Sequence, residues 1–548
     1  MERNFVETVA SGVRDNWIEN AYSDYQGDTY QYKDVAEWVM KFHILYARHN
    51  IRIGSKIAIL GKNSRNWAVA YMSALLNGST TVPILPDFHR EDVMHILDHS
   101  ESNLLFVSEE YYPEVDIEKL PRIQSIFKLN DFTLLFSRTQ ELRNDLDHLQ
   151  KLFDEKFPHG LDPEGFKVPA VPNTEIVTIN YTSGTAGFSK GVVLDYNSFM
   201  ANLQYAQDNM PLEPGNRIVG FLPLAHTFGC AFDFIFPTTL GCHITFLSKI
   251  PSPQVILKAF NDIKPHLVMF VPLVLEKIYT NRILPKLRKP AMKVMLAIPG
   301  INKVIYRKVG ATLAESFGNR FREVVIGGAA LNQEVETFLK KVGFKFAVGY
   351  GMTECGPLVS YASWRMHRNG ASGRPVDTLE MKIDSFDPYN EVGEIMVRGE
   401  NVMKEYYKNP EATQAALTED GWLRTGDLGL FDKDHFIYIK GRSKNLILGP
   451  SGQNIYPEAI ESKLNNMLYV TESVVVDRNG KLVALIFPDQ EVLKSGEMTQ
   501  DDLVEAMEKN RIALNTRLPK YMQVTAIELV SEEFEKTPKK SIKRYLYK

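Results

Sequence analysis

Cysteine is scarce in this chain, and its distribution excludes two classes of protein. The 548 residues contain three cysteines, Cys230, Cys242 and Cys355, and no two of them form a CxxC pair. A disulfide-stabilised secreted domain needs paired cysteines, and a zinc site needs closely spaced ones. The cysteines are therefore expected to be small buried thiols in a protein of a reducing compartment.

The sequence also lacks a signal peptide and a long uninterrupted hydrophobic run. Residues 1–5 do not show the charged and then apolar pattern of a secretory signal. The most apolar stretch, 221–247, contains His226, Asp233 and His243 and is interrupted by prolines and glycines. It is expected to form buried strands and turns, because a bilayer span needs about 20 predominantly apolar residues. We expect a cytoplasmic protein, and peripheral contact with a membrane stays open.

An excess of charge of one sign is missing as well. Lysine and arginine total 63 and aspartate and glutamate total 67, which gives a net charge of −4. This balance provides no general attraction to nucleic acid or to an anionic membrane. Basic residues cluster at 283–293 and at the C-terminus, and such short runs usually form solvated faces. The composition fits an ordinary globular protein that does not bind nucleic acid.

Short apolar strands alternate with helices along much of the chain. Over residues 56–107 the pattern predicts strands at 56–60, 80–85 and 103–107 and helices at 67–76 and 90–97. Alternation of this kind is typical of βαβ units and a parallel sheet. Further strands are predicted near 217–222, 243–247, 267–271 and 322–326.

The character of the chain changes near residue 440. Asn479-Gly480 between two apolar runs predicts a β-hairpin, and Thr499 begins a variant of the capping box that opens helices. We therefore predict an α/β protein with two domains. The large N-terminal domain, 1–440, has several subdomains with parallel-rich sheets and a small β-barrel-like unit. The C-terminal domain, 441–548, is a small, mobile α+β unit.

A glycine-rich loop with one lysine lies between two extended apolar runs. The loop reads Tyr181-Thr-Ser-Gly-Thr-Ala-Gly-Phe-Ser-Lys190-Gly191. Its backbone N–H groups and hydroxyls suit an anion, and Lys190 adds a positive charge. It is not a Walker A loop, because Ser189 precedes the lysine and Gly191 follows it. The loop predicts a cradle for a triphosphate or pyrophosphate, with a plain surface turn as the alternative.

Two segments downstream carry groups that suit the base and metal of a nucleotide. Ile326-Gly-Gly-Ala-Ala330 ends a predicted strand in small residues, which would let a flat ring such as adenine approach the backbone. Tight helix packing is the alternative. Val348-Gly-Tyr-Gly-Met-Thr-Glu354 offers an aromatic ring, a hydroxyl and a carboxylate. Hard carboxylate oxygens suit Mg²⁺ held beside phosphates.

Three more segments complete the set. The segment Gly421-Trp-Leu-Arg-Thr-Gly-Asp427 ends in an aspartate whose carboxylate suits ribose hydroxyls. The alternative is that Asp427 is an ordinary turn residue. Phe221-Leu-Pro-Leu-Ala-His226-Thr-Phe-Gly229 places one histidine at an apolar strand end, where a core histidine is the alternative. The tail Glu535-Lys-Thr-Pro-Lys-Lys-Ser-Ile-Lys-Arg544 is basic. Taken alone, the tail fits a solvated face equally well.

Together and in this order, these segments resemble the adenylate-forming superfamily of acyl-CoA synthetases, firefly luciferase relatives and peptide-synthetase adenylation domains. The likeness extends from about residue 25 to 546 and is greatest to long-chain fatty acyl-CoA synthetases, through 271–277 and 441–457. It implies that ATP and a carboxylic acid form an acyl-adenylate and pyrophosphate, with Mg²⁺. Coenzyme A then displaces AMP, after the small domain has rotated.

The resemblance also implies roles for individual residues. Those that would hold the phosphates are Thr182, Ser183, Gly184, Thr185 and Lys190. Those that would frame adenine are Gly328, Ala329, Gly349 and Tyr350. Asp427 and Arg442 would fix the ribose, and Glu354 would bind Mg²⁺. Lys444 would lie at the hinge, with Ser451 and Gly452 near CoA. The residues expected at the reacting groups are His226 at the acid pocket, Lys190, Thr353 at the α-phosphate and Lys540.

One departure from the family pattern concerns the reaction itself. A lysine that bridges the carboxylate and the α-phosphate usually follows Thr-Pro-x-x, and the corresponding residue here is Ser541, directly after Lys540. Lys540 would replace it only if the tail is flexible. The alternatives to a long-chain acyl-CoA synthetase are activation of another acid (medium-chain or aryl), transfer to a carrier protein, or a catalytically weakened nucleotide- and acyl-binding protein, and Ser541 supports the last of these. Acyl chain length and oligomeric state do not follow from the sequence.

Overall fold

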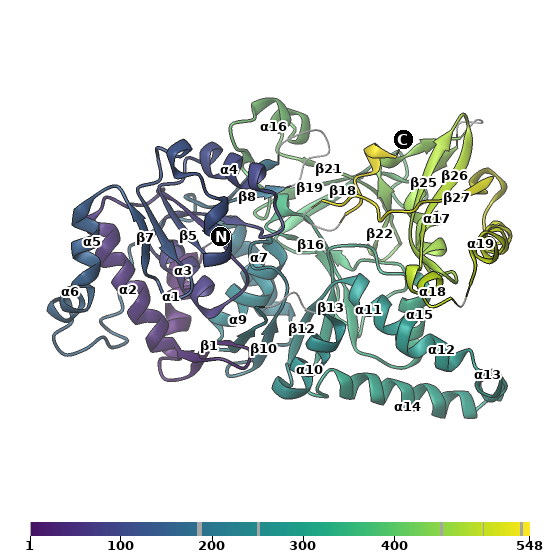
Figure 1. The fold of residues 1–548 in the computed structure, drawn as a ribbon, viewed down its shortest axis with the longest axis horizontal. Coiled ribbons are helices and arrows are strands. Elements are labelled where there is room, and N and C mark those ends of the chain that lie inside the picture. The colour runs from purple at the N-terminus through teal and green to yellow at the C-terminus, as the bar shows by residue number, and fades with distance from the viewer. Residues whose placement is uncertain are drawn as a thin grey trace.

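The computed structural model describes residues 2–182, 189–248, 252–449, 453–496, 498–537 and 541–547. Figure 1 shows a large N-terminal part, in purple to green, and a small C-terminal part at the right, in yellow-green and yellow. The prediction of an α/β fold with parallel-rich sheets and domains of unequal size is confirmed. Within the described part of the chain, no helix combines the length and the apolar character that crossing a membrane requires.

An eight-stranded sheet forms the centre of the N-terminal part. Its order is β20-β9-β8-β4-β3-β5-β6-β7. The strands are β3 (Lys56–Leu60), β4 (Thr80–Ile84), β5 (Leu104–Val107), β6 (Ser125–Lys128), β7 (Leu134–Ser137), β8 (Ile176–Thr182), β9 (Lys190–Asp195) and β20 (Glu405–Tyr406). The predicted βαβ units are present, because β3, β4 and β5 are parallel and are linked by α3 (Arg65–Leu76) and α4 (Arg90–His99).

A second sheet combines two strands near the N-terminus with two strands from residues 217–246, in the order β10-β11-β1-β2. Its strands are β1 (Asn20–Asp24), β2 (Thr29–Gln31), β10 (Arg217–Gly220) and β11 (His243–Phe246). The helices that pack around these two sheets include α1 (Phe5–Asp15), α2 (Tyr32–Arg48), α5 (Gln140–Asp147), α6 (Leu149–Lys156) and α7 (Tyr196–Asn209).

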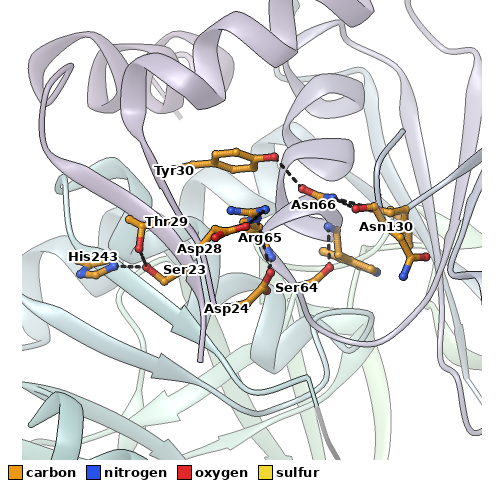
Figure 2. A network of polar contacts seen from close by, with 12 residues as sticks. Ser23, Asp24, Asp28, Thr29, Tyr30, Ser64, Arg65, Asn66, Asn130 and His243 are labelled. Carbon is orange, nitrogen blue, oxygen red and sulfur yellow. Dashed lines mark hydrogen bonds and ion pairs between the residues drawn. The ribbon is translucent and has the colours of Figure 1, made fainter. Parts of the chain in front are cut away.

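A polar network joins this second sheet to the start of α3 (Figure 2). The Arg65 backbone N–H donates to Asp24 Oδ1 over 2.9 Å, and its guanidinium pairs with Asp28 and lies 4.3 Å from the centre of the Tyr30 ring. Tyr30 in turn donates to Asn66, which donates to the carbonyl oxygens of Leu129 and Asn130. The network therefore fixes the edge of the second sheet against the central one.

The apolar stretch 221–247 differs from the prediction of buried strands and turns. Its middle part is helical, with α8 (Thr227–Gly229), a π-helical turn at Cys230–Ile235 and α9 (Phe236–Thr239), whereas β11 is a strand as predicted. The prediction was wrong for the middle part because a short continuous apolar run fits a buried strand and a buried helix equally well. The stretch is buried as expected, and Phe232, Phe234 and Phe236 lie in the core.

Three parallel strands and an antiparallel unit complete the N-terminal part. The parallel strands are β12 (Leu267–Phe270), β13 (Glu323–Ile326) and β14 (Phe346–Val348), with α10 (Pro253–Ile263), α11 (Pro272–Ile278), α14 (Ile301–Ser316) and α15 (Gln333–Lys341) around them. The antiparallel strands are β18 (Leu379–Asp384), β19 (Gly393–Gly399), β21 (Leu423–Phe431) and β22 (Ile437–Arg442). A smaller sheet consists of β15 (Tyr350–Gly351), β16 (Leu358–Tyr361) and β17 (Arg374–Pro375).

The C-terminal part contains α17 (Pro457–Leu464), α19 (Gln500–Asn515) and a sheet of β25 (Val470–Arg478), β26 (Lys481–Pro488) and β27 (Ala526–Leu529). The predicted hairpin joins β25 to β26, with positive φ at Asn479 and Gly480 as a tight turn requires. The predicted capping box at Thr499 is also present. The apolar side chains of this part form clusters of their own. The boundary at 440/441 stays a prediction.

Candidate active site

The small residues predicted to frame a flat ring lie at the ends of two adjacent strands. β13 and β14 pair in parallel, and the Gly349 N–H donates to the Ile326 carbonyl over 2.9 Å. Gly328 has a φ of +86°, and the nearest atom to a side chain placed there is Val271 Cγ1, 3.8 Å away. Ala329 beside it is exposed. Both loops thus form one open shelf at the carboxyl edge of the sheet, where ligands of α/β proteins bind.

Tyr350, Asp427 and Arg442 form a connected group next to this shelf. The Tyr350 hydroxyl donates to Asp427 Oδ2 over 2.7 Å, and Arg442 Nε lies 3.2 Å from Asp427 Oδ1. Asp427 and Arg442 are opposite each other on β21 and β22. Burial raises the pKa of Asp427, and the Arg442 charge opposes that rise. The structure therefore brings together the base-framing and ribose-binding residues predicted from separate motifs.

Lys190 and Glu354 are linked by a tyrosine that the sequence analysis did not select. Lys190 Nζ lies 4.7 Å from the centre of the Tyr406 ring, and the Tyr406 hydroxyl donates to Glu354 Oε1 over 2.8 Å. Burial is the main cause that raises the pKa of Tyr406 far above its ordinary value, so this hydroxyl stays protonated and donates. The contact exists because β20 pairs with β9, whose first residue is Lys190. No spacing or composition signal in the sequence indicates that pairing.

The carboxylate of Glu354 suits a magnesium ion. The residue is half-buried, and its Oε2 atom has no hydrogen bond to any described residue. Mg²⁺ usually takes one or two protein carboxylates and completes its shell with water and phosphate oxygens. Among the described residues, no group of three or more His, Cys, Asp or Glu side chains could hold a metal ion.

Other predicted residues lie around this centre or outside the described residues. Thr182 ends β8 opposite Lys190, and its hydroxyl donates to the Lys190 carbonyl over 3.4 Å. Thr353 is buried beside Glu354, and Lys444 is exposed in the turn after β22. The predicted residues that lie outside the described ones are Ser183, Gly184, Thr185, Ser451, Gly452 and Lys540.

His226 caps a helix and does not end a strand. It precedes α8, and its Nδ1 atom accepts the Phe228 N–H over 3.3 Å. The Phe228 ring in turn lies 3.2 Å from the position that a side chain on Gly327 would take, so this loop borders the glycine shelf. The structure therefore does place the half-buried His226 beside the predicted nucleotide site.

Two buried asparagines that the sequence analysis missed hold the His226 loop in place. Asn63 accepts the Leu224 N–H over 2.9 Å and donates to the Leu222 carbonyl over 2.7 Å. Asn180 on β8 donates to the Ala225 carbonyl over 3.1 Å. These bonds tie the loop to the sheet that also carries Lys190. An isolated asparagine offers no sequence signal, since only the fold reveals which carbonyl it faces.

The basic tail forms a paired hairpin. Lys536 and Ile542 are bridge partners, and the Thr537 N–H donates to the Ser541 carbonyl over 2.8 Å. The Ser541 N–H donates to the Thr537 hydroxyl over 3.3 Å. Both bonds use the Ser541 backbone, and the residue is exposed. The tail is thus held in register on both sides of residues 538–540, which lie outside the described residues.

The tail is anchored to α17, the helix that also touches the predicted hinge. Arg544 pairs with Glu461 on α17, and Glu461 also accepts the Val475 N–H over 2.6 Å. At the first turn of the same helix, Glu458 accepts from Asn445 over 2.6 Å. The other carboxylate oxygen of Glu458, Oε2, lies 2.9 Å from the position that a Cβ atom on Gly441 would take. One helix therefore connects the tail to the strand end that carries Arg442.

Removing Arg544 should destabilise the C-terminal part in a pH-dependent way. Burial raises the pKa of Glu461 from 4.5 to about 7, although the Arg544 charge opposes the shift. Because the pKa of Glu461 is higher in the folded protein than in the unfolded chain, its contribution to the unfolding free energy is complete below pH 4.5. That contribution is lost as the pH rises through 7. In Arg544→Ala an ionised Glu461 is buried without its partner, which costs about 3–5 kcal/mol. The loss in unfolding free energy should therefore be larger at about pH 8 than at about pH 5.

A neighbouring residue supplies the control for that measurement. Lys543 pairs with Glu535 at the exposed side of the tail, and such exposed pairs contribute about 0–1 kcal/mol. Lys543→Ala should therefore cost little at either pH. An Arg544→Ala loss that is equal at both pH values would contradict the assignment of the effect to Glu461.

The sequence matches the two domain models of a known enzyme family over most of its length. The family model of AMP-binding enzymes matches residues 14–407, and the model of the AMP-binding enzyme C-terminal domain matches residues 444–547. The long-chain-fatty-acid–CoA ligase FadD15 of Mycobacterium bovis is 29% identical over 477 residues, which cover 81% of this chain and 74% of that protein. The chloroplastic long-chain-fatty-acid–[acyl-carrier-protein] ligase AEE15 of Arabidopsis thaliana is 24% identical, with coverages of 84% and 72%.

A solved structure shows the same fold over the whole chain. The anthranilate CoA ligase AuaEII in complex with anthranoyl-AMP superposes with a TM-score of 0.78 at 20% sequence identity. The match covers 100% of this chain and 96% of that one. The relative arrangement of the sheets around Lys190, Glu354 and Asp427 is therefore shared with a solved structure.

Proposed function

This chain belongs to the AMP-binding enzyme family, and on that premise we propose that it activates a long-chain fatty acid for transfer to coenzyme A. The coarser activity is established by the family: the chain is an AMP-forming ligase that makes an acyl-adenylate and uses ATP and Mg²⁺. The proposal adds the acid, the thiol acceptor and the roles of individual residues.

The contacts that bring Lys190, Glu354 and Asp427 together carry the assignment of roles: Tyr406 links Lys190 to Glu354, and Asp427 is close enough to Glu354 for the two charges to interact. Lys190 and Thr182 contact the phosphates of ATP, while Glu354 holds Mg²⁺ beside them. Adenine lies on the shelf of Gly328, Ala329 and Gly349, against Tyr350. Asp427 and Arg442 bind the ribose, since Tyr350 orients Asp427 and Asp427 pairs with Arg442. When bound, Mg²⁺ supplies positive charge that offsets the negative charge on the phosphates.

The first step joins the acid to AMP. A carboxylate oxygen attacks the α-phosphorus, the bond from that phosphorus to the β-phosphate oxygen breaks, and pyrophosphate leaves. Such a transfer depends mainly on alignment of the two reactants and on stabilising charge on the phosphoryl oxygens. Lys190 provides that charge, Thr353 contacts the α-phosphate, and His226 lines the acid entrance. At the tail position where a bridging lysine is usual, this chain has Ser541, so Lys540 reaches the carboxylate only if the tail shifts by one residue.

The second step transfers the acyl group to sulfur. The coenzyme A thiolate attacks the acyl carbonyl carbon, the bond to the phosphate oxygen breaks, and AMP leaves. In this proposal the C-terminal domain, 441–548, rotates about Lys444 between the two steps. Ser451 and Gly452 then lie beside coenzyme A. The contact of α17 with Gly441 and with the tail supports the idea that hinge and tail move as one unit.

A long-chain acid is favoured by the family relatives and is open to a direct test. FadD15 is named for a long-chain acid and coenzyme A, whereas AEE15 is named for an acyl-carrier protein and AuaEII for an aromatic acid. AMP release should be measured with acids from acetate to palmitate and with benzoate, offering coenzyme A or a carrier protein. We expect palmitate with coenzyme A to be the best pair. Faster release with benzoate, or only with the carrier protein, would contradict the proposal.

Tyr406 should act as a positioning residue for Glu354. In Tyr406→Phe the ring remains above Lys190 but the hydrogen bond to the Glu354 carboxylate is lost. A hydrogen bond to a charged group is worth about 1.5–3 kcal/mol, so adenylation should slow by about tenfold or more. The rate should be measured at several Mg²⁺ concentrations. Because the hydroxyl orients the metal-binding carboxylate, the half-saturating Mg²⁺ concentration should rise, while a purely structural defect would leave it unchanged.

A further inference from the structure

The helical hairpin formed by α13 (Pro290–Ala297) and α14 presents apolar side chains to solvent. None of the eight residues of α13 is buried, although most of them are apolar. Val294 is 65% exposed and Val304 on α14 is 68% exposed, and Ile298 and Ile301 between them are each 43% exposed. In Figure 1 the hairpin forms the lower edge of the molecule, away from the central sheet. Several exposed apolar side chains on one hairpin are typical of an interaction site.

The same segment has a strong positive charge. Nine lysines and arginines lie between Lys277 and Ala314, with no aspartate or glutamate, in a chain whose net charge is −4. None of the nine forms an ion pair with a described residue. The run at 283–293, interpreted from the sequence as a solvated face, is therefore part of a larger basic and apolar surface. Basic residues next to exposed apolar ones are typical of helices that lie on anionic membranes.

A basic hollow adjoins the apolar hairpin. It has a volume of about 470 Å³. Its charged lining consists of Lys303 and Arg307 on α14 and Lys340 and Lys341 at the end of α15. These helices are held close together, since a side chain on Gly310 of α14 would meet the Val342 carbonyl at 2.0 Å. Four cations around one hollow suit the phosphate of a lipid headgroup.

We propose that the α13–α14 hairpin and this hollow dock the protein on a bilayer surface that contains anionic phospholipid. Val294, Ile298, Ile301 and Val304 enter the interface between headgroups and acyl chains, and Lys303 and Arg307 bind lipid phosphate. A bilayer explains the exposed apolar residues, which an interaction based on charge alone would not need. The inference rests on this surface and does not depend on the proposed acid.

Docking at this face would place the membrane at one end of a series of short consecutive helices that begins at the candidate active site. α11 follows Val271, which faces Gly328 on the glycine shelf. The chain then runs through the helical turn Tyr279–Ile283 and α12 (Leu284–Leu287) into α13. A fatty acid that partitions into the bilayer would therefore be concentrated beside the enzyme that consumes it.

The experiment is sedimentation of the full-length protein with lipid vesicles. The wild-type protein should co-sediment at low salt with vesicles of equal parts phosphatidylglycerol and phosphatidylcholine. Vesicles of pure phosphatidylcholine should bind much less protein. Added salt should release the protein. Lys303→Glu with Arg307→Glu should lower the partition coefficient at least about tenfold, because each basic residue near such a surface contributes about fivefold. Val294→Asp with Val304→Asp should lower it comparably.

A matched control lies on the C-terminal part. Val504 on α19 is 53% exposed and Lys520 is an exposed lysine outside this surface, so Val504→Asp with Lys520→Glu should bind vesicles like the wild type. Each variant should retain its AMP release with a water-soluble acid, which shows that it is folded. Vesicle binding that survives both hairpin variants would overturn the proposal. The proposal would also be overturned if the protein did not bind vesicles and the hairpin instead mediated a dimer of the chain or bound an acidic protein.

Discussion

Replacing Glu354 by glutamine is expected to lower the rate of acyl-adenylate formation by about 10²–10³-fold, the loss typical of removing one preorganised electrostatic group from an active site. The change removes the negative charge that attracts Mg²⁺ but keeps an oxygen that can accept the Tyr406 hydrogen bond, which joins the two side chains over 2.8 Å. Folding should therefore be little affected. Pyrophosphate exchange measured against Mg²⁺ concentration should show a large increase in the concentration needed for half-saturation.

The neighbouring Glu405 gives a matched control for this prediction. It lies beside Tyr406 on the same short strand, is exposed, and its side chain forms no hydrogen bond or ion pair with a described residue. Glu405→Gln removes one negative charge next to Tyr406 and should change the exchange rate by less than about twofold, since isolated surface charges contribute little. If both variants lost activity equally, the effect would come from the overall electrostatic potential of the site and not from metal binding by Glu354. If neither did, Glu354 would not be the metal ligand.

The parts of the fold and site that could be predicted are those set by local pattern. β3 at Lys56–Leu60 was predicted with its observed ends, because a short apolar strand between turn residues has a distinct signature. Gly328 and Gly349 were assigned to one adenine site through the family resemblance, and the structure places them after the adjacent parallel strands β13 and β14. Tyr350 and Asp427 were selected from separate motifs, and the structure shows that they form a hydrogen bond.

The parts that could not be predicted depend on contacts between distant segments. Tyr406 reaches Lys190 only because β20 adds to the edge of the central sheet, and a two-residue strand has no periodicity to detect. Asn63 and Asn180 orient the His226 loop through carbonyl oxygens, which every residue possesses and no sequence pattern marks. The helices within 221–247 were missed because uniform hydrophobicity removes the alternation that separates helix from strand.

The other large effect is expected from Ser541→Lys, which should raise the rate of ATP–pyrophosphate exchange by about 10²–10³-fold, the usual contribution of one preorganised charged donor. In the resemblance described above, a lysine at this position bridges the acid carboxylate and the α-phosphate. Ser541 is exposed and makes its two hydrogen bonds with Thr537 through its backbone, so the longer side chain removes neither bond. Ser541→Met, similar in length but uncharged, should give no increase.

A comparison of the two half-reactions identifies which lysine acts during adenylation. Thioester formation from supplied acyl-adenylate does not need the bridging charge, so Ser541→Lys should leave its rate nearly unchanged. If Lys540 already bridges the reactants, Ser541→Lys will give no increase and Lys540→Ala will abolish exchange. The hairpin pairing of Lys536 with Ile542 argues against that outcome, because a paired tail resists the one-residue shift that would bring Lys540 to the position of Ser541. A slow wild-type adenylation, accelerated by lysine at 541, is therefore the result that this tail geometry favours.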